Sequence, residues 1–170
     1  MKKVFFTLTS VLIILVIVAL LLVSRKEKGL TADLTIPFGE LSKFESIVNK
    51  FEPTNKPKLL ILFSPGCDFC EEEFLNIDQK LEKLSGIQLI LISPYKKAAV
   101  EDFIKKYKFS GHSETSVLLG NHTTLDKIFG RYSFPTLFIL DKNGKVLRKF
   151  NGIVNFDAVL CQIHNNKELQ

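Results

Sequence analysis

The feature that most constrains this chain is an apolar run that leads directly into a pair of cysteines. Residues 58–64, "KLLILFS", lie between two prolines, and such a continuous apolar run predicts a strand buried on both faces. Cys67 and Cys70 follow it, and apolar side chains then recur at helical spacing up to about Leu84, which predicts a helix. The cysteines therefore lie where a buried strand turns into a helix.

The rest of the sequence predicts an α/β domain. Two strand-like runs joined by Asn143-Gly144 are typical of an antiparallel hairpin, whereas strands that alternate with helices are expected to be parallel. The predicted fold is a three-layer α/β/α sandwich with a mixed sheet. Helices are predicted over residues 40–51, 68–84, 96–107, 123–130 (with a threonine cap) and 155–164, and strands over residues 58–64, 86–93, 116–120, 134–140 and 145–152.

An uncharged segment of 20 residues, 4–23, stands near the amino end. As a helix it would extend roughly 30 Å, the thickness of the hydrocarbon core of a bilayer. A cleaved signal peptide has a shorter apolar region and a small-residue cleavage site, so we expect an uncleaved signal anchor, a transmembrane helix. Basic residues flank both ends and leave its orientation open. The expected organisation is an anchor with its flank at 1–24, a tether at 25–37, a domain at 38–166 and a tail at 167–170.

The net charge of +5 does not indicate a nucleic-acid-binding protein. From Gly29 onward the chain has 18 basic and 17 acidic residues, so most of the surplus flanks the apolar segment. A nucleic-acid-binding face would need a basic cluster in the domain itself. We therefore expect no nucleic-acid partner.

Cys67 and Cys70 are best interpreted as a redox pair. A thiol at the start of a helix meets unpaired N–H groups and the positive end of the helix dipole, so Cys67 is expected to attack as a thiolate. Cys70 lies one turn further along, where a resolving thiol is near but shielded. A structural disulfide across so small a ring would add little stability, and a metal site would need further ligands from Cys161 or three scattered histidines. Cys161 itself is expected to be a buried, unreactive thiol.

Two motifs together resemble the thioredoxin superfamily: "FSPGCDFC" between a strand and a helix, and "SFPTLFILDKNGKV" further along. The likeness is greatest to the membrane-tethered, exported TlpA/ResA-like thiol–disulfide oxidoreductases, and it covers residues 38–164. It implies a cis peptide bond between Phe134 and Pro135, beside the cysteines; a proline that begins an edge strand is the alternative. It also implies that Glu73 manages protons near the thiols, although residues 71–73 could all be solvated acids favoured by the helix dipole.

The sequence departs from the family pattern around the cysteines. Gly66 replaces the tryptophan that precedes the first cysteine, and Ile61 replaces a buried acid of many thioredoxins. Asp68 and Phe69 stand between the cysteines, and the nearby carboxylates oppose a thiolate at Cys67. Because a less stabilised thiolate makes the disulfide harder to reduce, the sequence predicts a reductant.

The function expected from the sequence is therefore that of a membrane-tethered thiol–disulfide oxidoreductase, which reduces the disulfides of exported client proteins through Cys67 and Cys70. The resemblance implies a domain on the outer face of a bacterial cytoplasmic membrane, periplasmic or extracellular, and a transmembrane thiol carrier as the electron donor. This chemistry needs no organic cofactor and no metal. The alternative is a copper-binding metal chaperone on the same fold, although related copper proteins have one more residue between their cysteines.

Overall fold

The computed structural model describes residues 12–18 and 34–166, and the chain divides after Leu34 into two units. Residues 12–18 are helical and their apolar side chains are exposed. Most of the predicted anchor and tether, and the tail at 167–170, lie outside the described residues. No helix within the described residues is long and apolar enough to cross a bilayer.

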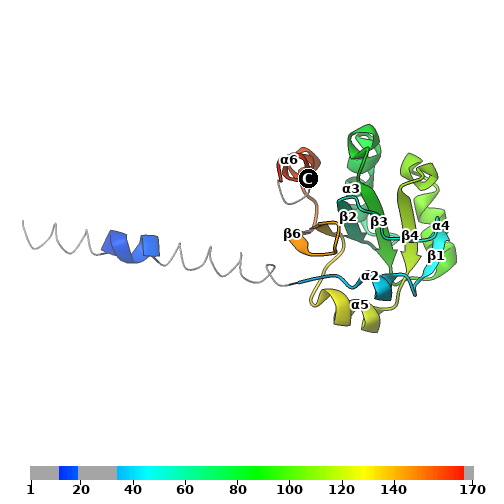
Figure 1. Cartoon of the computed structure of the whole chain (residues 1–170), viewed down its shortest axis with the longest axis horizontal. Coiled ribbons are helices and arrows are strands. Elements are labelled where there is room, and N and C mark those ends of the chain that lie inside the picture. The colour runs from blue at the N-terminus through cyan, green and yellow to red at the C-terminus, as the bar shows by residue number, and fades with distance from the viewer. Residues whose placement is uncertain (1–11, 19–33, 167–170) are drawn as a thin grey trace, which may run out of the picture. The chain divides into compact units, whose positions relative to one another are not determined.

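A six-stranded mixed sheet forms the centre of the second unit (Figure 1). The strand order is β1-β4-β3-β2-β5-β6. The three strands β2, β3 and β4 are parallel, and each of the others is antiparallel to its neighbour. The strands are β1 Glu45–Val48, β2 Lys58–Leu62, β3 Gln88–Ser93, β4 Thr115–Leu119, β5 Thr136–Leu140 and β6 Val146–Asn151.

Helices cover both faces of this sheet, which confirms the predicted three layers. On one face, α3 (Asp68–Asp78), α4 (Lys97–Ile104) and α6 (Phe156–Asn165) share an apolar cluster with alternate strand residues such as Leu59 and Ile61. On the other face, α5 (His122–Phe129) packs through Phe129, whose ring centroid lies 5.4 Å from that of Phe138 on β5. The shorter helical segments are α2 Phe38–Leu41 and two 3₁₀ turns, Leu81–Leu84 and Lys108–Gly111.

The helix predicted over residues 40–51 is wrong. The single turn of α2 ends at Leu41, and β1 then pairs antiparallel with β4 at the edge of the sheet. The β-branched residues Ile47 and Val48 suit an extended backbone, and the otherwise open edge of β4 supplies their hydrogen bonds. The helical spacing in the sequence could not reveal that this edge would be available.

Helix ends also differ from the prediction, and α4 ends at Ile104 rather than at residue 107. The helix that follows the cysteines ends at Asp78, and the apolar pattern beyond it belongs to the 3₁₀ turn Leu81–Leu84. The cap of α5 is Asn121, whose side chain accepts a hydrogen bond from the N–H of Thr124, and not a threonine. The predicted Asn-Gly hairpin between β5 and β6 is confirmed, and the Asp141 carboxylate accepts hydrogen bonds from backbone N–H groups within its turn.

Candidate active site

The cysteine pair follows the carboxyl end of β2, where α3 begins. Strand β2 lies in the middle of the sheet (Figure 1). Because β2 is parallel to β3 and antiparallel to β5, the arrangement of neighbouring strands changes at this point. Such positions at the carboxyl ends of strands are where open α/β sheets bind their ligands. In the turn that leads to Cys67, Gly66 has φ +75°, which glycine adopts without strain. A tryptophan at this position would be strained.

Cys67 is the N-cap residue of α3. Its carbonyl oxygen accepts hydrogen bonds from the N–H groups of Cys70 at 2.9 Å and Glu71 at 3.0 Å, so the helix begins directly behind it. Its side chain is half-buried, and its Sγ lies 3.8 Å from the carbonyl oxygen of Phe134. The sulfur therefore remains reachable from solvent and lies at the positive end of the helix dipole.

Cys70 lies one turn behind Cys67 and is fully buried. Burial, with smaller contributions from the Cys67 thiol and the Glu73 carboxyl, raises the pKa of its thiol to about 12, while a hydrogen bond from the Ser64 backbone opposes the rise. Cys70 is thus a protected thiol that stays protonated until a base removes its proton.

Glu73 is fully buried, which excludes for this residue the interpretation as a solvated acid. Its Oε2 accepts a hydrogen bond from the Val154 N–H at 3.0 Å, but its buried Oε1 has no partner among the described residues. Burial raises the pKa of this carboxyl, the Val154 N–H lowers it, and the charge of Glu72 adds to the rise. Its neighbour Glu71 is instead paired with Lys106 at 2.9 Å on the surface.

The peptide bond between Phe134 and Pro135 is cis, as the resemblance implied. The contact between the Phe134 carbonyl and Cys67 places this loop against the thiols. Thr136, which is fully buried, donates a hydrogen bond from its hydroxyl to the Ser133 carbonyl at 2.7 Å. The structure therefore brings both sequence motifs together at the carboxyl end of β2.

The sequence analysis did not assign three aromatic side chains to this site: Tyr95, His122 and Tyr132. Tyr95 and Tyr132 pack against Phe134, and His122 packs against Tyr95. Tyr95 follows β3, a strand parallel to β2, so its loop leaves the sheet at the same edge as Cys67. That position in a loop after a parallel strand was a usable signal. Tyr132, before β5, and His122, at the start of α5, carried no comparable signal.

Cys161 is exposed, so the expectation of a buried thiol is wrong. Helix α6 buries Phe156, Val159, Leu160 and Ile163, and position 161 falls on the opposite side of the helix. The Asn165 side chain donates a hydrogen bond to the Cys161 sulfur at 3.0 Å. The apolar neighbours in sequence thus did not place this residue inward.

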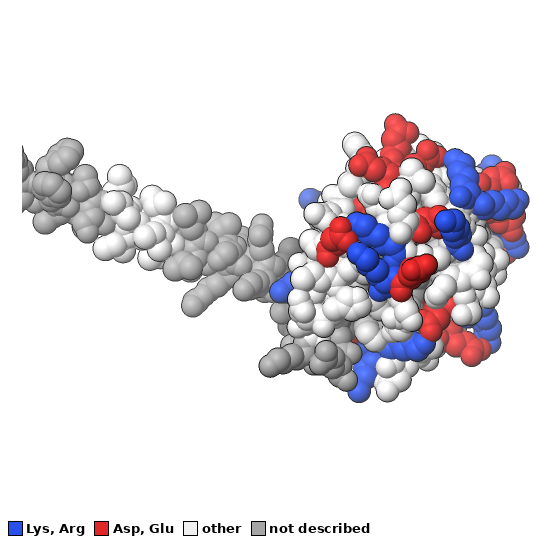
Figure 2. Space-filling model, turned by 90° about the horizontal axis from the view of Figure 1, so that it is seen from above, with Lys and Arg blue, Asp and Glu red and all other residues white. Residues whose placement is uncertain are grey.

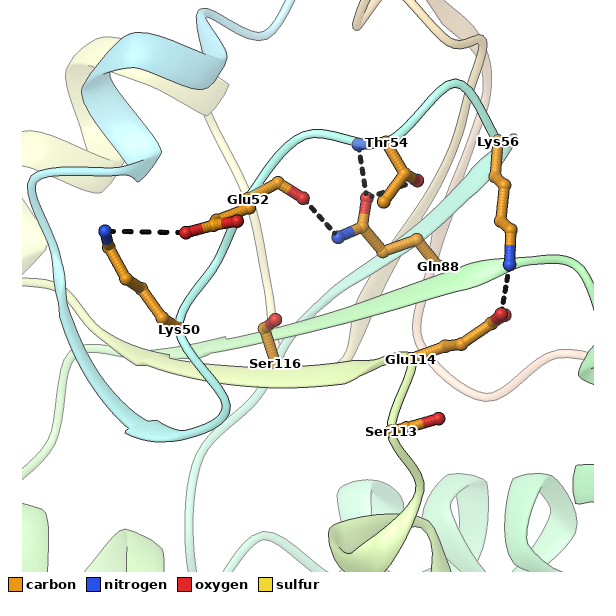
Figure 3. A pocket seen from close by; sticks show the side chains of 8 residues that line it. All are labelled: Lys50, Glu52, Thr54, Lys56, Gln88, Ser113, Glu114 and Ser116. Atoms are coloured by element: carbon orange, nitrogen blue, oxygen red, sulfur yellow. Dashed lines mark hydrogen bonds and ion pairs between the residues drawn. The ribbon is translucent and has the colours of Figure 1, made fainter.

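A cavity of about 200 Å³ lies away from the cysteines, at the amino ends of β2, β3 and β4 (Figure 3). It is polar, and ion pairs join Lys50 to Glu52 at 3.5 Å and Lys56 to Glu114. It contains none of the candidate site residues. Its lining consists of Lys50, Glu52, Thr54, Lys56, Gln88, Ser113, Glu114 and Ser116.

Charged side chains of both signs share the surface of the second unit. On the face seen in Figure 2, basic and acidic groups are interspersed. Surface ion pairs include Lys80 with Asp157 at 2.6 Å and Lys97 with Glu45 at 2.9 Å. Such pairing neutralises basic groups that a nucleic-acid-binding face would keep available.

A model of the thioredoxin-like domain family matches residues 44–167. The chain belongs to this family. No curated protein matches the chain.

Solved structures resemble this thioredoxin-like chain in fold. A protein described as the thiol:disulfide interchange protein DsbE from Chlorobium tepidum is 21% identical, with a TM-score of 0.59, over 76% of this chain and 95% of that one. A secreted Mycobacterium tuberculosis disulfide oxidoreductase is 16% identical, with a TM-score of 0.56, over 67% and 84%. The exposed lipoprotein thioredoxin of Streptococcus pneumoniae is 20% identical, with a TM-score of 0.53, over 67% and 87%. At these identities the likeness shows the shared fold.

Proposed function

We propose that this thioredoxin-like chain is a membrane-tethered thiol–disulfide oxidoreductase that reduces the disulfides of exported client proteins. The observation that carries this proposal is the arrangement of the two cysteines. Cys67 is half-buried at the start of α3 against the Phe134–Pro135 loop, and Cys70 is buried directly behind it. An accessible attacking sulfur with a shielded partner is what thiol–disulfide exchange requires.

The reaction consists of two exchanges of sulfur partners. The Cys67 thiolate attacks one sulfur of the client disulfide, a bond forms between Cys67 and the client, and the other client sulfur leaves as a thiolate and takes up a proton. Cys70 then loses its proton and attacks the Cys67 sulfur, which releases the second client thiolate. The client gains two electrons, and the protein is left with a Cys67–Cys70 disulfide.

We assign to Glu73 the removal of the proton from Cys70. The raised pKa of Cys70 means that the second exchange needs a base, and the charge of Glu73 acts on this thiol. The unpartnered Oε1 and the raised pKa of the Glu73 carboxyl suit a group that exchanges protons. Pro135 and Phe134 support the site by bringing the loop and its carbonyl against Cys67.

The proposed location is the outer face of a bacterial cytoplasmic membrane, with residues 4–23 as a single membrane-spanning anchor. The uncharged segment of 20 residues supports it. Structural relatives that are described as secreted or as an exposed lipoprotein are consistent with an exported domain. A transmembrane thiol carrier would return the protein to its dithiol state.

A trapping experiment tests the proposed order of attack. Cys70→Ser should accumulate client proteins that are disulfide-linked to Cys67, because the second exchange cannot occur. Cys67→Ser should trap none, and Cys161→Ser in the Cys70→Ser background should trap the same clients. Clients that remain linked to the Cys67→Ser chain would contradict the assignment of the attacking sulfur.

The copper-binding alternative receives no support from a specific site. Within residues 12–18 and 34–166, no group of three or more His, Cys, Asp or Glu side chains could hold a metal ion. Copper that is retained in equal amount to the protein after dialysis, and that is lost in Cys67→Ser, would favour this alternative.

A further inference from the structure

Two exposed aromatic side chains adjoin the segments that carry and contact Cys67. Three large apolar side chains of the described second unit are exposed: Phe69 by 61%, Leu75 by 53% and Tyr95 by 40%. Phe69 lies in the first turn of α3, directly after the N-cap Cys67 and Asp68. The ring centroid of Tyr95 lies 6.0 Å from that of Phe134, the residue whose carbonyl contacts Cys67. Exposed apolar side chains beside a reactive group are where a partner's apolar surface can be buried, and Phe69 and Tyr95 occupy such positions.

The ring of Tyr95 is held by other rings. It packs edge-on against His122, with centroids 5.7 Å apart, and against Phe134. The ring centroids of Tyr132 and Phe134 lie 5.4 Å apart, and the Tyr132 hydroxyl lies 3.4 Å from Nδ1 of His122. Each of the four rings therefore contacts two of the others. These residues come from the loop after β3, the start of α5 and the segment before β5. Tyr95 is therefore preorganised, which reduces the entropy lost when a partner binds.

We propose that Tyr95 and Phe69 select client segments that carry an aromatic or large apolar side chain next to the disulfide-bonded cysteine. This inference rests on the proposed function, because the partner that reaches this surface is the client segment whose disulfide Cys67 attacks. In an extended client segment, side chains one or two residues from the cysteine lie about 3–7 Å further along. Tyr95 packs against Phe134, whose carbonyl oxygen lies 3.8 Å from the Cys67 sulfur, and Phe69 follows Cys67 by two residues, so both side chains belong to segments that adjoin the sulfur a client would reach. Aromatic side chains gain free energy from such edge-to-face contacts as well as from burial.

Leu75 provides a matched control for this surface. It is as exposed as the two aromatic residues and lies on the same helix as Phe69. Its position is eight residues beyond Cys67, which corresponds to about 12 Å along the helix axis. A polar substitution at Leu75 therefore removes exposed apolar surface without changing the surroundings of the reactive sulfur.

The test compares two disulfide-bonded peptides that differ only by Phe or Ser beside the cysteine. The reduced full chain in detergent should show a kcat/KM about tenfold higher for the Phe peptide. Tyr95→Ser and Phe69→Ser should each lower this ratio about threefold or more, and Leu75→Ser should leave it unchanged. Equal kcat/KM values for the two peptides, or a ratio that survives in Tyr95→Ser, would overturn the inference.

A binding measurement separates this inference from the proposed function. The same peptides with serine in place of cysteine are titrated into the full chain carrying Cys67→Ser and Cys70→Ser, and fluorescence anisotropy gives the two affinities. If the wild-type chain reduces neither peptide nor oxidised glutathione, the proposed function fails, and the affinity ratio alone decides the inference. A preference for the Phe peptide that Tyr95→Ser removes would support it; equal affinities would overturn it.

Discussion

A buried ionisable side chain lies at the amino end of β2 and another lies beyond its carboxyl end. The two side chains differ in how many hydrogen-bond partners they have. At the amino end, Lys58 is fully buried, and its ammonium donates hydrogen bonds to the carbonyls of Thr54 and Lys56 at 2.8 Å and of Lys142 at 3.4 Å. It also lies 4.8 Å from the ring centroid of Phe38. Beyond the carboxyl end, Glu73 has one hydrogen bond at 3.0 Å and an oxygen without a partner among the described residues.

This difference separates a structural group from a chemical one. The acceptors around Lys58 tie β2 to the loop before it and to the β5–β6 hairpin, although burial still lowers the pKa of Lys58 to about 8, against the effect of Asp141. Glu73 has no such set of partners. A buried group with unused hydrogen-bonding capacity, whose charge acts on the Cys70 thiol, is available for proton exchange.

The strongest test concerns the reacting sulfur. Cys67→Ser should lower the rate of insulin reduction by about a thousandfold or more, because the nucleophile is removed. Cys161→Ser, on the far side of α6, should retain the wild-type rate. A Cys67→Ser chain that keeps roughly a tenth or more of the wild-type activity would show that the carboxyl end of β2 is not the reactive site.

At the other end of β2, Lys58→Met should lower the free energy of unfolding by about 3 kcal/mol, because buried carbonyls lose their donor. The loss should grow with pH. The folded chain gives up the Lys58 proton above about pH 8, whereas the unfolded chain keeps it up to 10.5. Between these values unfolding takes up a proton, so wild-type stability rises with pH relative to Lys58→Met. Urea unfolding followed by circular dichroism measures both effects; a constant difference across this range would contradict the pKa shift.

Glu73→Gln should slow the second exchange by about a hundredfold at neutral pH, and remove one ionisation from its pH–rate profile. The free energy of unfolding of the wild-type chain should fall, relative to that of Glu73→Gln, as the pH rises. Because the folded pKa of Glu73 is raised, its contribution to stability is present at low pH and is lost as the pH rises through that pKa. The variant should therefore gain stability over wild type toward higher pH.

Glu72→Gln is the comparison for this variant, since Glu72 is exposed and acts on Glu73 only through its charge, so its effect on the second exchange should be much smaller. Stopped-flow measurement of mixed-disulfide resolution distinguishes the two substitutions. Equal rates in Glu73→Gln and Glu72→Gln would refute the assigned role of Glu73.

The smallest effects are expected at two glycines, one at each end of β2. Gly144, in the hairpin turn, has φ +92°, and a methyl group there would lie 2.5 Å from the carbonyl oxygen of Ile36. Gly66 has φ +75° but open space around it. Gly144→Ala should thus cost about 2 kcal/mol of stability and Gly66→Ala about 1 kcal/mol. Thermal unfolding would show the order, and a reversed order would mean that the contact with Ile36 does not matter.

Contiguous patterns explain what could be predicted from the sequence. The strand, the turn and the helix around Cys67 and Cys70 lie within about twenty residues, a distance over which sequence periodicity is informative, and the helix dipole acts within the first turn. The β5–β6 hairpin is equally local, since Asn143-Gly144 supports a tight turn. The cis bond before Pro135 followed from the motif that resembled a known family.

Only the tertiary structure decided which side chains are buried and with which partners. Glu73 meets the N–H of Val154, 81 residues away, and Lys58 meets the carbonyl of Lys142, 84 residues away. Pairing with the edge of β4 makes residues 45–48 a strand in spite of their helical spacing, and the packing of α6 leaves Cys161 exposed. Periodicity in the sequence reports which face of an element is apolar. The burial of a charge, and hence its pKa, depends on groups that only the folded chain brings together.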